Sequence, residues 1–305
     1  MAFEAAAGYG NLPNGNWSPI IYSKKVLKFF RTVSVVDEVT NTDYAGEIKN
    51  EGETVKIIKE PLITVRDYRR GKKIEPQDLN DEELSLVVDQ AKEFSFQVDD
   101  IESAHSHINW SALAESSGAY ALKDAYDTNI LQYMYDNGTT NAGVGVQGTE
   151  KTVGYGAANN FTPLDYVLRF KRLLDENDAP EMGRYFIAPP AFYEALVRED
   201  GKLIDMQVTG DPESALRNTK IGYRKLHGFM MLTSNNLPVD SSSDPIVLAG
   251  HVSAVATATT ILKSESFRSH DFFGDVFRGL LVFGRKVLRP EALFSGVCTI
   301  GDVDS

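Results

Sequence analysis

Residues 84–98 alternate apolar and polar side chains over a length that few globular strands reach. The apolar positions are Leu84, Leu86, Val88, Phe94, Phe96 and Val98. A continuous strand here would extend roughly 50 Å at about 3.3 Å per residue, whereas ordinary strands have about 5–6 residues. The stretch 53–66 is rich in β-branched residues and is interrupted by Pro61. We therefore predict two long strands, 53–66 and 84–98, that form a hairpin projecting from the body.

The tip of this predicted hairpin separates its charges. Basic side chains come first and acidic side chains follow, namely Arg66, Arg69, Arg70, Lys72, Lys73, Glu75, Asp78, Asp81, Glu82 and Glu83. The acidic half cancels the basic half, which argues against a DNA-binding patch. A solvated loop is one interpretation. The other is charge pairing between subunits, with Arg66, Arg69, Arg70, Lys72, Lys73, Asp81, Glu82 and Glu83 as candidate contacts.

An isolated two-stranded hairpin is marginally stable in water, so this one needs a surface to lie on. A neighbouring subunit could supply that surface. The first 40 residues also have the composition of an arm, because glycine and proline punctuate residues 8–19. A basic and apolar stretch follows at 24–31. It fits a membrane-surface helix or an arm that packs on a neighbouring subunit or on its own core, and we favour the arm.

Residues 109–135 predict a long helix with Asn109 as N-cap and Gly138 as stop signal. One side of this helix carries an apolar stripe, namely Ala119, Leu122, Tyr126, Ile130 and Tyr133. The opposite side carries small residues, namely Ser117, Ala121 and Ala125. This pattern predicts a helix that is covered on both sides. Such a helix would extend about 40 Å, which suits the spine of a domain.

Residues 140–260 have the pattern of a compact α/β domain. Thr162 followed by Pro163 opens a helix, 184–188 is a strand, and Pro190 opens a second helix that reaches Val197. The segments 219–233 and 246–249 follow. The last part is rich in strands, at 276–288 and 294–300, with a break at 289–291.

Composition excludes several classes of protein. The net charge of −12 argues against a dedicated nucleic-acid binder, although it suits a container wall that must not adhere to DNA. The single cysteine, Cys298, rules out an intramolecular disulfide and sits in an apolar context that predicts burial. No apolar run approaches a membrane span, and the first residues do not resemble a secretory signal, so cytoplasmic synthesis is expected.

Sequence motifs for catalysis, cofactor binding or metal binding are weak in this chain. Residues 143–148 fit G-x-G-x-x-G with Asp165 downstream, but the motif follows a long helix and leads into more loop, so we interpret it as a flexible loop. His105 and His107 form an H-x-H pair without an evident third ligand. There is no G-x-S-x-G, Walker or H-E-x-x-H motif. We expect no catalytic residues, no cofactor and no metal.

The order of elements resembles the tailed-bacteriophage major capsid proteins of the Hong Kong 97 type. Local strings that carry the resemblance occur along nearly the whole chain, at 44–55, 88–101, 221–229, 234–238 and 282–291. Among them, Phe96-Gln97-Val98-Asp99-Asp100-Ile101 resembles the return strand of the extended loop. Val282-Phe283-Gly284-Arg285-Lys286-Val287 resembles a late strand of the peripheral domain. Each string alone is weak evidence of the resemblance, whereas their order and spacing together are fairly specific to the family.

This resemblance implies an α+β Hong Kong 97-like capsid fold with a defined domain layout. It comprises an N-terminal arm (1–45), an extended β-hairpin loop (46–100), a peripheral domain with the spine helix (101–138 and 261–305) and an α/β axial domain (139–260). It also implies a non-enzymatic subunit that self-assembles into pentamers and hexamers of an icosahedral virion shell around double-stranded DNA, which it contacts only non-specifically. Because the arm begins almost at Met1, a separate scaffolding protein is expected, with a portal and possible decoration proteins as further partners. No membrane is involved.

Two alternatives stay open. An encapsulin-like nanocompartment resembles the same fold but encloses proteins. A nucleotide-binding enzyme would use the glycine loop at 143–148.

Overall fold

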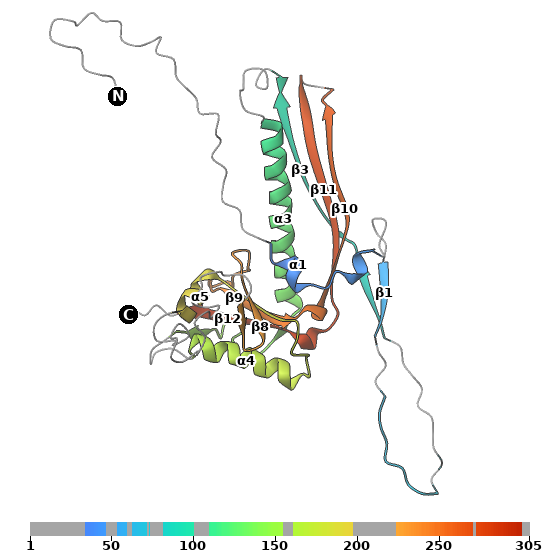
Figure 1. The fold of residues 1–305 in the computed structure, drawn as a ribbon, viewed down its shortest axis with the longest axis vertical. Helices are drawn as coiled ribbons and strands as arrows, with labels where there is room; N and C mark the ends of the chain where they lie inside the picture. The colour runs from blue at the N-terminus through green and yellow to red at the C-terminus, as the bar shows by residue number, and fades with distance from the viewer. Residues whose placement is uncertain are drawn as a thin grey trace, which may run out of the picture.

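A computed structural model describes residues 34–46, 54–59, 63–71, 73, 82–100, 110–154, 161–197, 224–270 and 273–300. Within these ranges the chain forms an elongated part, a compact part and a projecting hairpin (Figure 1). No helix among them is long and apolar enough to cross a membrane.

The elongated part pairs one long helix with a three-stranded antiparallel sheet (Figure 1). The helix is α3 (Trp110–Asn137), and the strand order is β10 (Val255–Arg268), β11 (Gly274–Val287), β3 (Gln90–Asp99). Phe94 lies opposite Gly279 in the register and fills the space between the two layers. A Cβ atom at Gly279 would lie 2.3 Å from the Phe94 ring, and one at Gly118 of α3 would lie 2.6 Å from it. Glycine at both positions therefore allows the helix and the sheet to approach closely.

The compact part is a mixed seven-stranded sheet in the order β4-β12-β9-β6-β8-β7, with β5 also paired to β12. Its strands are β4 (Thr139–Thr140), β5 (Lys151–Val153), β6 (Arg184–Ala188), β7 (Arg224–Leu226), β8 (Phe229–Thr233), β9 (Ile246–His251) and β12 (Leu293–Ile300). Helices α4 (Pro163–Glu176) and α5 (Pro190–Val197) pack on one face through Phe170, Phe186 and Phe192. The C-terminal end of α3 lies in a second hydrophobic core, to which it contributes Ile130, Leu131 and Met134.

Short helical turns connect the two parts. The 3-10 helix η3 (Val252–Ala254) joins β9 to β10, and η4 (Pro290–Ala292) joins β11 to β12. At the start of the described chain, α1 (Val36–Val39) and the 3-10 helix η1 (Asp43–Gly46) run from α3 towards β10. Val36 and Val39 are fully buried in the core that α3 shares with the sheet.

The projecting hairpin differs from its prediction. It consists of β1 (Thr54–Lys59) and β2 (Glu82–Val87), paired from Thr54–Val87 to Lys59–Glu82. The predicted continuous strand 84–98 is wrong, because it ends at Val87 and β3 pairs with β11 instead. Leu86 and Val88 are buried against Ala256, Ala258 and Val282. This small core holds the chain where it passes from the hairpin into the elongated sheet.

The strand predicted over 53–66 is also wrong beyond Lys59, since residues 63–69 carry no regular secondary structure. The prediction that α3 is covered on both sides fails at Ser117 and Ala121, which are exposed in the single chain. Several other predictions are confirmed. The spine helix, the strand at 184–188, the helix from Pro190 and the C-terminal strands all form, and Thr162 caps α4 by accepting a hydrogen bond from the Asp165 N–H at 3.2 Å.

Candidate assembly surfaces and the strap on the spine helix

The basic segment of the hairpin lies fully in solvent. Every described residue from 63 to 71 is exposed, as is Lys73, so Arg66, Arg69 and Arg70 lie in solvent outside any helix or strand. Lys72 and Asp81 lie outside the described residues, and of Glu82 only the backbone position in β2 is described. The structure therefore places the basic contacts on an accessible segment, and their pairing with another subunit stays a prediction.

Glu83 has a partner within the hairpin itself. The Lys56 ammonium donates a hydrogen bond to its carboxylate at 2.7 Å across the β1–β2 pair. That hydrogen bond and the attraction between the charges raise the pKa of Lys56, although both side chains are exposed. An exposed pair of this kind contributes little to stability. Glu83 is thus already paired within its own hairpin.

The same segment exposes apolar side chains. Val65 is 93% exposed and Tyr68 is 73% exposed, with Ile58 and Ile63 close to these values. Four large apolar side chains on one projecting hairpin, without a core of their own, are unusual for a surface that stays in water. This observation favours a surface that another molecule covers.

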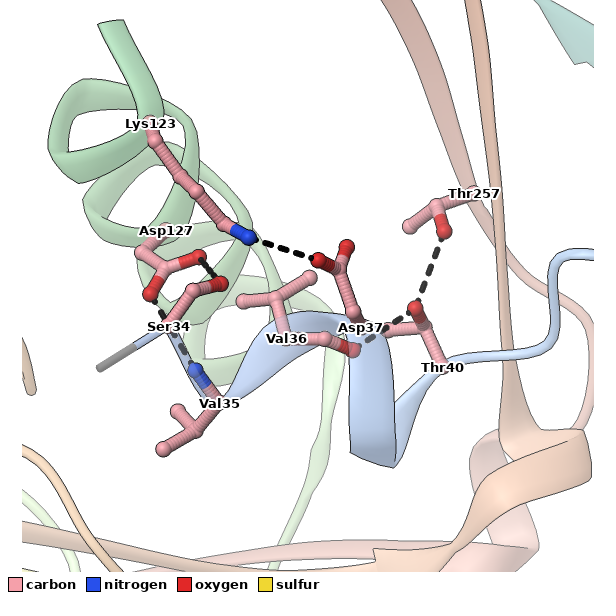
Figure 2. Close-up of polar contacts among 8 residues, drawn as sticks. All are labelled: Ser34, Val35, Val36, Asp37, Thr40, Lys123, Asp127 and Thr257. Carbon is pink, nitrogen blue, oxygen red and sulfur yellow. Dashed lines mark hydrogen bonds and ion pairs between the residues drawn. The ribbon is translucent and has the colours of Figure 1, made fainter. Parts of the chain in front are cut away.

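A strap at the start of the described chain ties the spine helix to the sheet (Figure 2). Ser34 donates its hydroxyl to Asp127 of α3 at 2.6 Å, and the Val35 N–H donates to the other oxygen of that carboxylate at 3.2 Å. At its far end, the Thr40 hydroxyl contacts that of Thr257 in β10 at 2.9 Å. We define the strap as residues 34–41.

An ion pair links the middle of the strap to α3. The Lys123 ammonium lies 3.1 Å from the Asp37 carboxylate (Figure 2). Burial raises the pKa of the Asp127 carboxyl above its ordinary value, and the hydrogen bonds from Ser34 and Val35 offset part of this effect. Asp127 is only 2% exposed, so its two donors are essential partners in the core.

Two further contacts fix α3 in place. The Arg285 guanidinium of β11 donates to both the backbone carbonyl and the side-chain oxygen of Asn129, and lies 4.4 Å from the centre of the Tyr133 ring. The Asn236 amide, in the loop after β8, donates to Asp124 at 2.7 Å. The spine helix therefore has polar links to both sheets, and its position depends on both.

The glycine loop at 143–148 is a packing feature of the compact sheet. Gly145 has a φ of +94°, and a Cβ atom there would lie 2.1 Å from the Val297 carbonyl oxygen. The Val297 N–H donates to the Gly145 carbonyl at 3.2 Å. The loop follows β4 and leads into the short strand β5, and it does not open a helix, so it lacks the strand-to-helix context of a dinucleotide site. Asp165 instead accepts from the Thr162 hydroxyl at 2.7 Å.

No group of three or more potential metal ligands among His, Cys, Asp and Glu occurs in the described part of the chain. His105 and His107 lie outside the described residues. The predicted burial of Cys298 is confirmed, and burial raises the pKa of its thiol to about 12.

The strap was missed by sequence reasoning. The only local signal was Asp127, an acidic residue directly after Tyr126 in the apolar stripe of the helix. Its partners Ser34 and Val35 are more than 90 positions away, and nothing in their local sequence marks them.

Neither a protein-family model nor a curated protein sequence matches the chain. Solved structures do match over nearly the whole chain. A chain from Mycobacterium phage Che8 is 27% identical with a TM-score of 0.77, and the match covers 92% of this chain and 97% of that one. The capsid of the cyanophage P-SCSP1u matches at 18% identity and a TM-score of 0.74, covering 98% and 100% of the two chains. The mature capsid of bacteriophage PhiM1 matches at 14% identity and a TM-score of 0.72, with the same coverage. These matches confirm the prediction from the sequence: the chain has the Hong Kong 97-like fold of the tailed-phage major capsid proteins.

Proposed function

We propose that copies of this chain form the pentamers and hexamers of an icosahedral virion shell that encloses double-stranded DNA. The observation that carries this proposal is the match to the phage Che8 chain, which covers nearly all of both molecules. The shell subunit would be a structural protein that needs no cofactor.

The domain layout expected for such a subunit follows the predicted boundaries. The arm (1–45) and the extended loop (46–100) would reach neighbouring copies. The segments 101–138 and 261–305 would contribute the peripheral domain around α3, and 139–260 the axial domain at the centre of each capsomer. Within the last segment, β12 pairs with β9 in the compact sheet and would belong with the axial domain. A separate scaffolding protein, a portal and decoration proteins would be partners during assembly in the host cytoplasm.

The net charge of −12 supports this function in a specific way. A wall with surplus negative charge repels packaged DNA and leaves it mobile. The basic segment 63–73 is an exception, with five basic residues and one acidic residue. In an assembled shell it would neutralise acidic surface on another copy.

The test is assembly of the purified full-length chain with and without a co-expressed scaffolding protein, followed by size exclusion and negative-stain electron microscopy. Closed shells, or rings of five and six, are expected. The ratio of absorbance at 260 and 280 nm then separates a DNA container from an encapsulin-like protein container. A monodisperse monomer or dimer under both conditions would contradict the proposal.

A second experiment tests the basic contacts. Reversal of Arg69, Arg70, Lys72 and Lys73 to Glu should leave the monomer folded and impair assembly. Reversal of Lys171 and Arg172 on α4, of which Arg172 is exposed, is a control for altered charge elsewhere on the subunit. Normal particles from the loop variant would remove the basic segment from the interface.

A further inference from the structure

One buried carboxylate in the compact part lacks a hydrogen-bond donor. Asp240, in the segment between β8 and β9, is 7% exposed, and its Oδ2 atom has no hydrogen-bond partner among the described residues. The other two charged residues that are buried in the described chain, Asp127 and Arg184, both have polar partners. A buried charge without a partner is costly, so this carboxylate oxygen calls for a positively charged neighbour.

Asp240 opens a tight hairpin turn. Its N–H donates to the Asp244 carbonyl at 2.9 Å, and the Ser243 N–H donates to the Asp240 carbonyl at 2.8 Å. Ser243 has a φ of +66°, and an antiparallel bridge joins Val239 to Pro245 next to the turn. These are the features of a type I turn that ends in a β-bulge. In such a turn, residues 240 and 244 lie opposite each other.

This geometry places two carboxylates on the same face of the hairpin. Residues that lie opposite each other in an antiparallel pair have Cβ atoms about 4.5–5.5 Å apart and side chains on the same face. Like charges at such positions destabilise the pair. Asp240 and Asp244 are placed in this way. A cation held between them would remove the repulsion and would also supply the missing partner of the buried Oδ2 atom.

The chemistry of the turn selects the kind of cation. Every residue from 240 to 244 is Asp or Ser, so oxygen is the only side-chain ligand atom that the turn offers. Ca²⁺ binds about 6–8 oxygen atoms in a flexible arrangement, and takes them from carboxylates, backbone carbonyls and water. Mg²⁺ requires a nearly ideal octahedron and gives up its waters reluctantly. The turn therefore suits Ca²⁺ better than Mg²⁺.

We propose that Asp240 and Asp244 bind a Ca²⁺ ion at the turn between β8 and β9. The two carboxylates supply the charged ligands, and backbone carbonyls of the turn and water supply the rest. With only two carboxylates the affinity is modest, with a dissociation constant on the order of 0.1–1 mM. The proposal departs from the expectation of no metal that the sequence motifs support. It does not depend on whether copies of the chain assemble.

The turn lies where three other segments of the chain meet. The Ser241 hydroxyl accepts from the Gln147 side-chain amide of the glycine loop at 3.3 Å. The Pro245 carbonyl accepts from the Cys298 N–H of β12 at 3.2 Å. At the end of α3, burial and the nearby Asp240 carboxylate both raise the pKa of the Tyr135 phenol. A bound ion that fixes this turn therefore stabilises the contact between the glycine loop, β12 and the spine helix.

Thermal unfolding of the unassembled full-length chain tests the site, in a calcium chelator and in about 10 mM CaCl₂. The melting temperature of the wild type should rise by about 2 °C or more on addition of Ca²⁺. Asp240→Asn should lose this rise, and in the chelator it should be at least as stable as the wild type, because it removes the unpartnered charge. Asp178→Asn is the matched control, since Asp178 is an exposed acidic residue of another turn, and it should keep the full rise.

Terbium luminescence gives a second readout that does not depend on stability. Tb³⁺ replaces Ca²⁺ in oxygen sites and emits when a nearby tyrosine such as Tyr135 is excited. The affinity for Tb³⁺ should fall at least tenfold in Asp240→Asn and in Asp244→Asn, and should stay unchanged in Asp178→Asn. Equal affinities in all variants would place the ion elsewhere on the acidic surface, and a wild type that responds to neither ion would assign the Oδ2 atom to water. Either result would overturn the calcium site and leave the shell function untouched.

Discussion

Ser34 and Asp127 are 93 positions apart in the chain, yet the hydroxyl of one donates to the carboxylate of the other at 2.6 Å in a half-buried contact. This contact begins the strap, which continues over Lys123 and ends at Thr257 on β10 (Figure 2). The strap thus ties the spine helix to β10 of the sheet.

Replacing Asp127 with alanine should lower the free energy of unfolding by about 1–3 kcal/mol. The change leaves the buried Val35 N–H and the half-buried Ser34 hydroxyl without their acceptor. Urea denaturation measures the loss, and faster hydrogen exchange at residues 34–41 would locate it. Asp136→Ala is the control, because Asp136 is exposed and bonds only to Gln132 in the same helix. It should change stability by less than about 0.5 kcal/mol.

The raised pKa of Asp127 gives a pH dependence with a definite sign. Because the native carboxyl binds its proton more tightly than the unfolded one, its contribution to stability is present below the ordinary pKa of 3.8 and is lost as the pH rises through the raised native pKa. The free energy of unfolding of the wild type, minus that of Asp127→Asn, should therefore decrease as the pH rises through this window. A difference that increases with pH would contradict burial as the dominant cause.

Arg285→Lys should destabilise the chain by about 1–2 kcal/mol despite keeping the charge. The guanidinium bonds two oxygens of Asn129 and stacks on the Tyr133 ring, and an ammonium cannot do both. Urea denaturation would measure the effect. Arg172→Lys alters an exposed i,i+4 pair with Glu176 and should fall within about 0.5 kcal/mol of the wild type. Equal effects from both variants would mean that the Arg285 contacts add nothing.

The Cys298 thiol should be inert in the folded chain. Burial raises its pKa to about 12, so at pH 8 the thiolate fraction is about a thousandfold below that of an unperturbed cysteine. Labelling with a thiol-specific chromogenic disulfide should be slow in buffer and complete in denaturant, and Cys298→Ser should give no signal in either. Rapid stoichiometric labelling of native protein would show that the β12 core opens locally.

The elements that could be predicted from the sequence are those with local signals. The spine helix, the capped helix after Thr162 and the C-terminal strands each carry their own periodicity or capping residues. The alternation at 84–98 was correctly interpreted as strand and wrongly interpreted as one strand. Alternation gives the faces of a strand but not its partner, and here the partner changes from β1 to β11 at Val88 and Asp89.

The strap and the close approach of α3 to the sheet could not be predicted for a related reason. Both depend on contacts between distant segments, such as Ser34 with Asp127, or the Phe94 ring with Gly118 and Gly279. The two glycines carry no signal of this contact in the sequence, since small residues occur in many helices and strands. The glycine loop at 143–148 shows the opposite case. Its G-x-G-x-x-G spacing is a local signal for a nucleotide site, but in the structure it reflects close packing of the backbone.

The glycine at 145 should prove indispensable for folding, and the glycine at 148 much less so. Both have positive φ, so alanine at either position costs about 1–2 kcal/mol in backbone strain. At Gly145 the new Cβ atom also meets the Val297 carbonyl oxygen at 2.1 Å, whereas at Gly148 it meets nothing within 4 Å. Gly145→Ala should therefore cost about 3 kcal/mol or more, or prevent folding, and thermal unfolding would compare the two variants. A dinucleotide site at this loop would have a separate signature, because added NAD would then stabilise the wild type and Gly148→Ala would abolish that stabilisation.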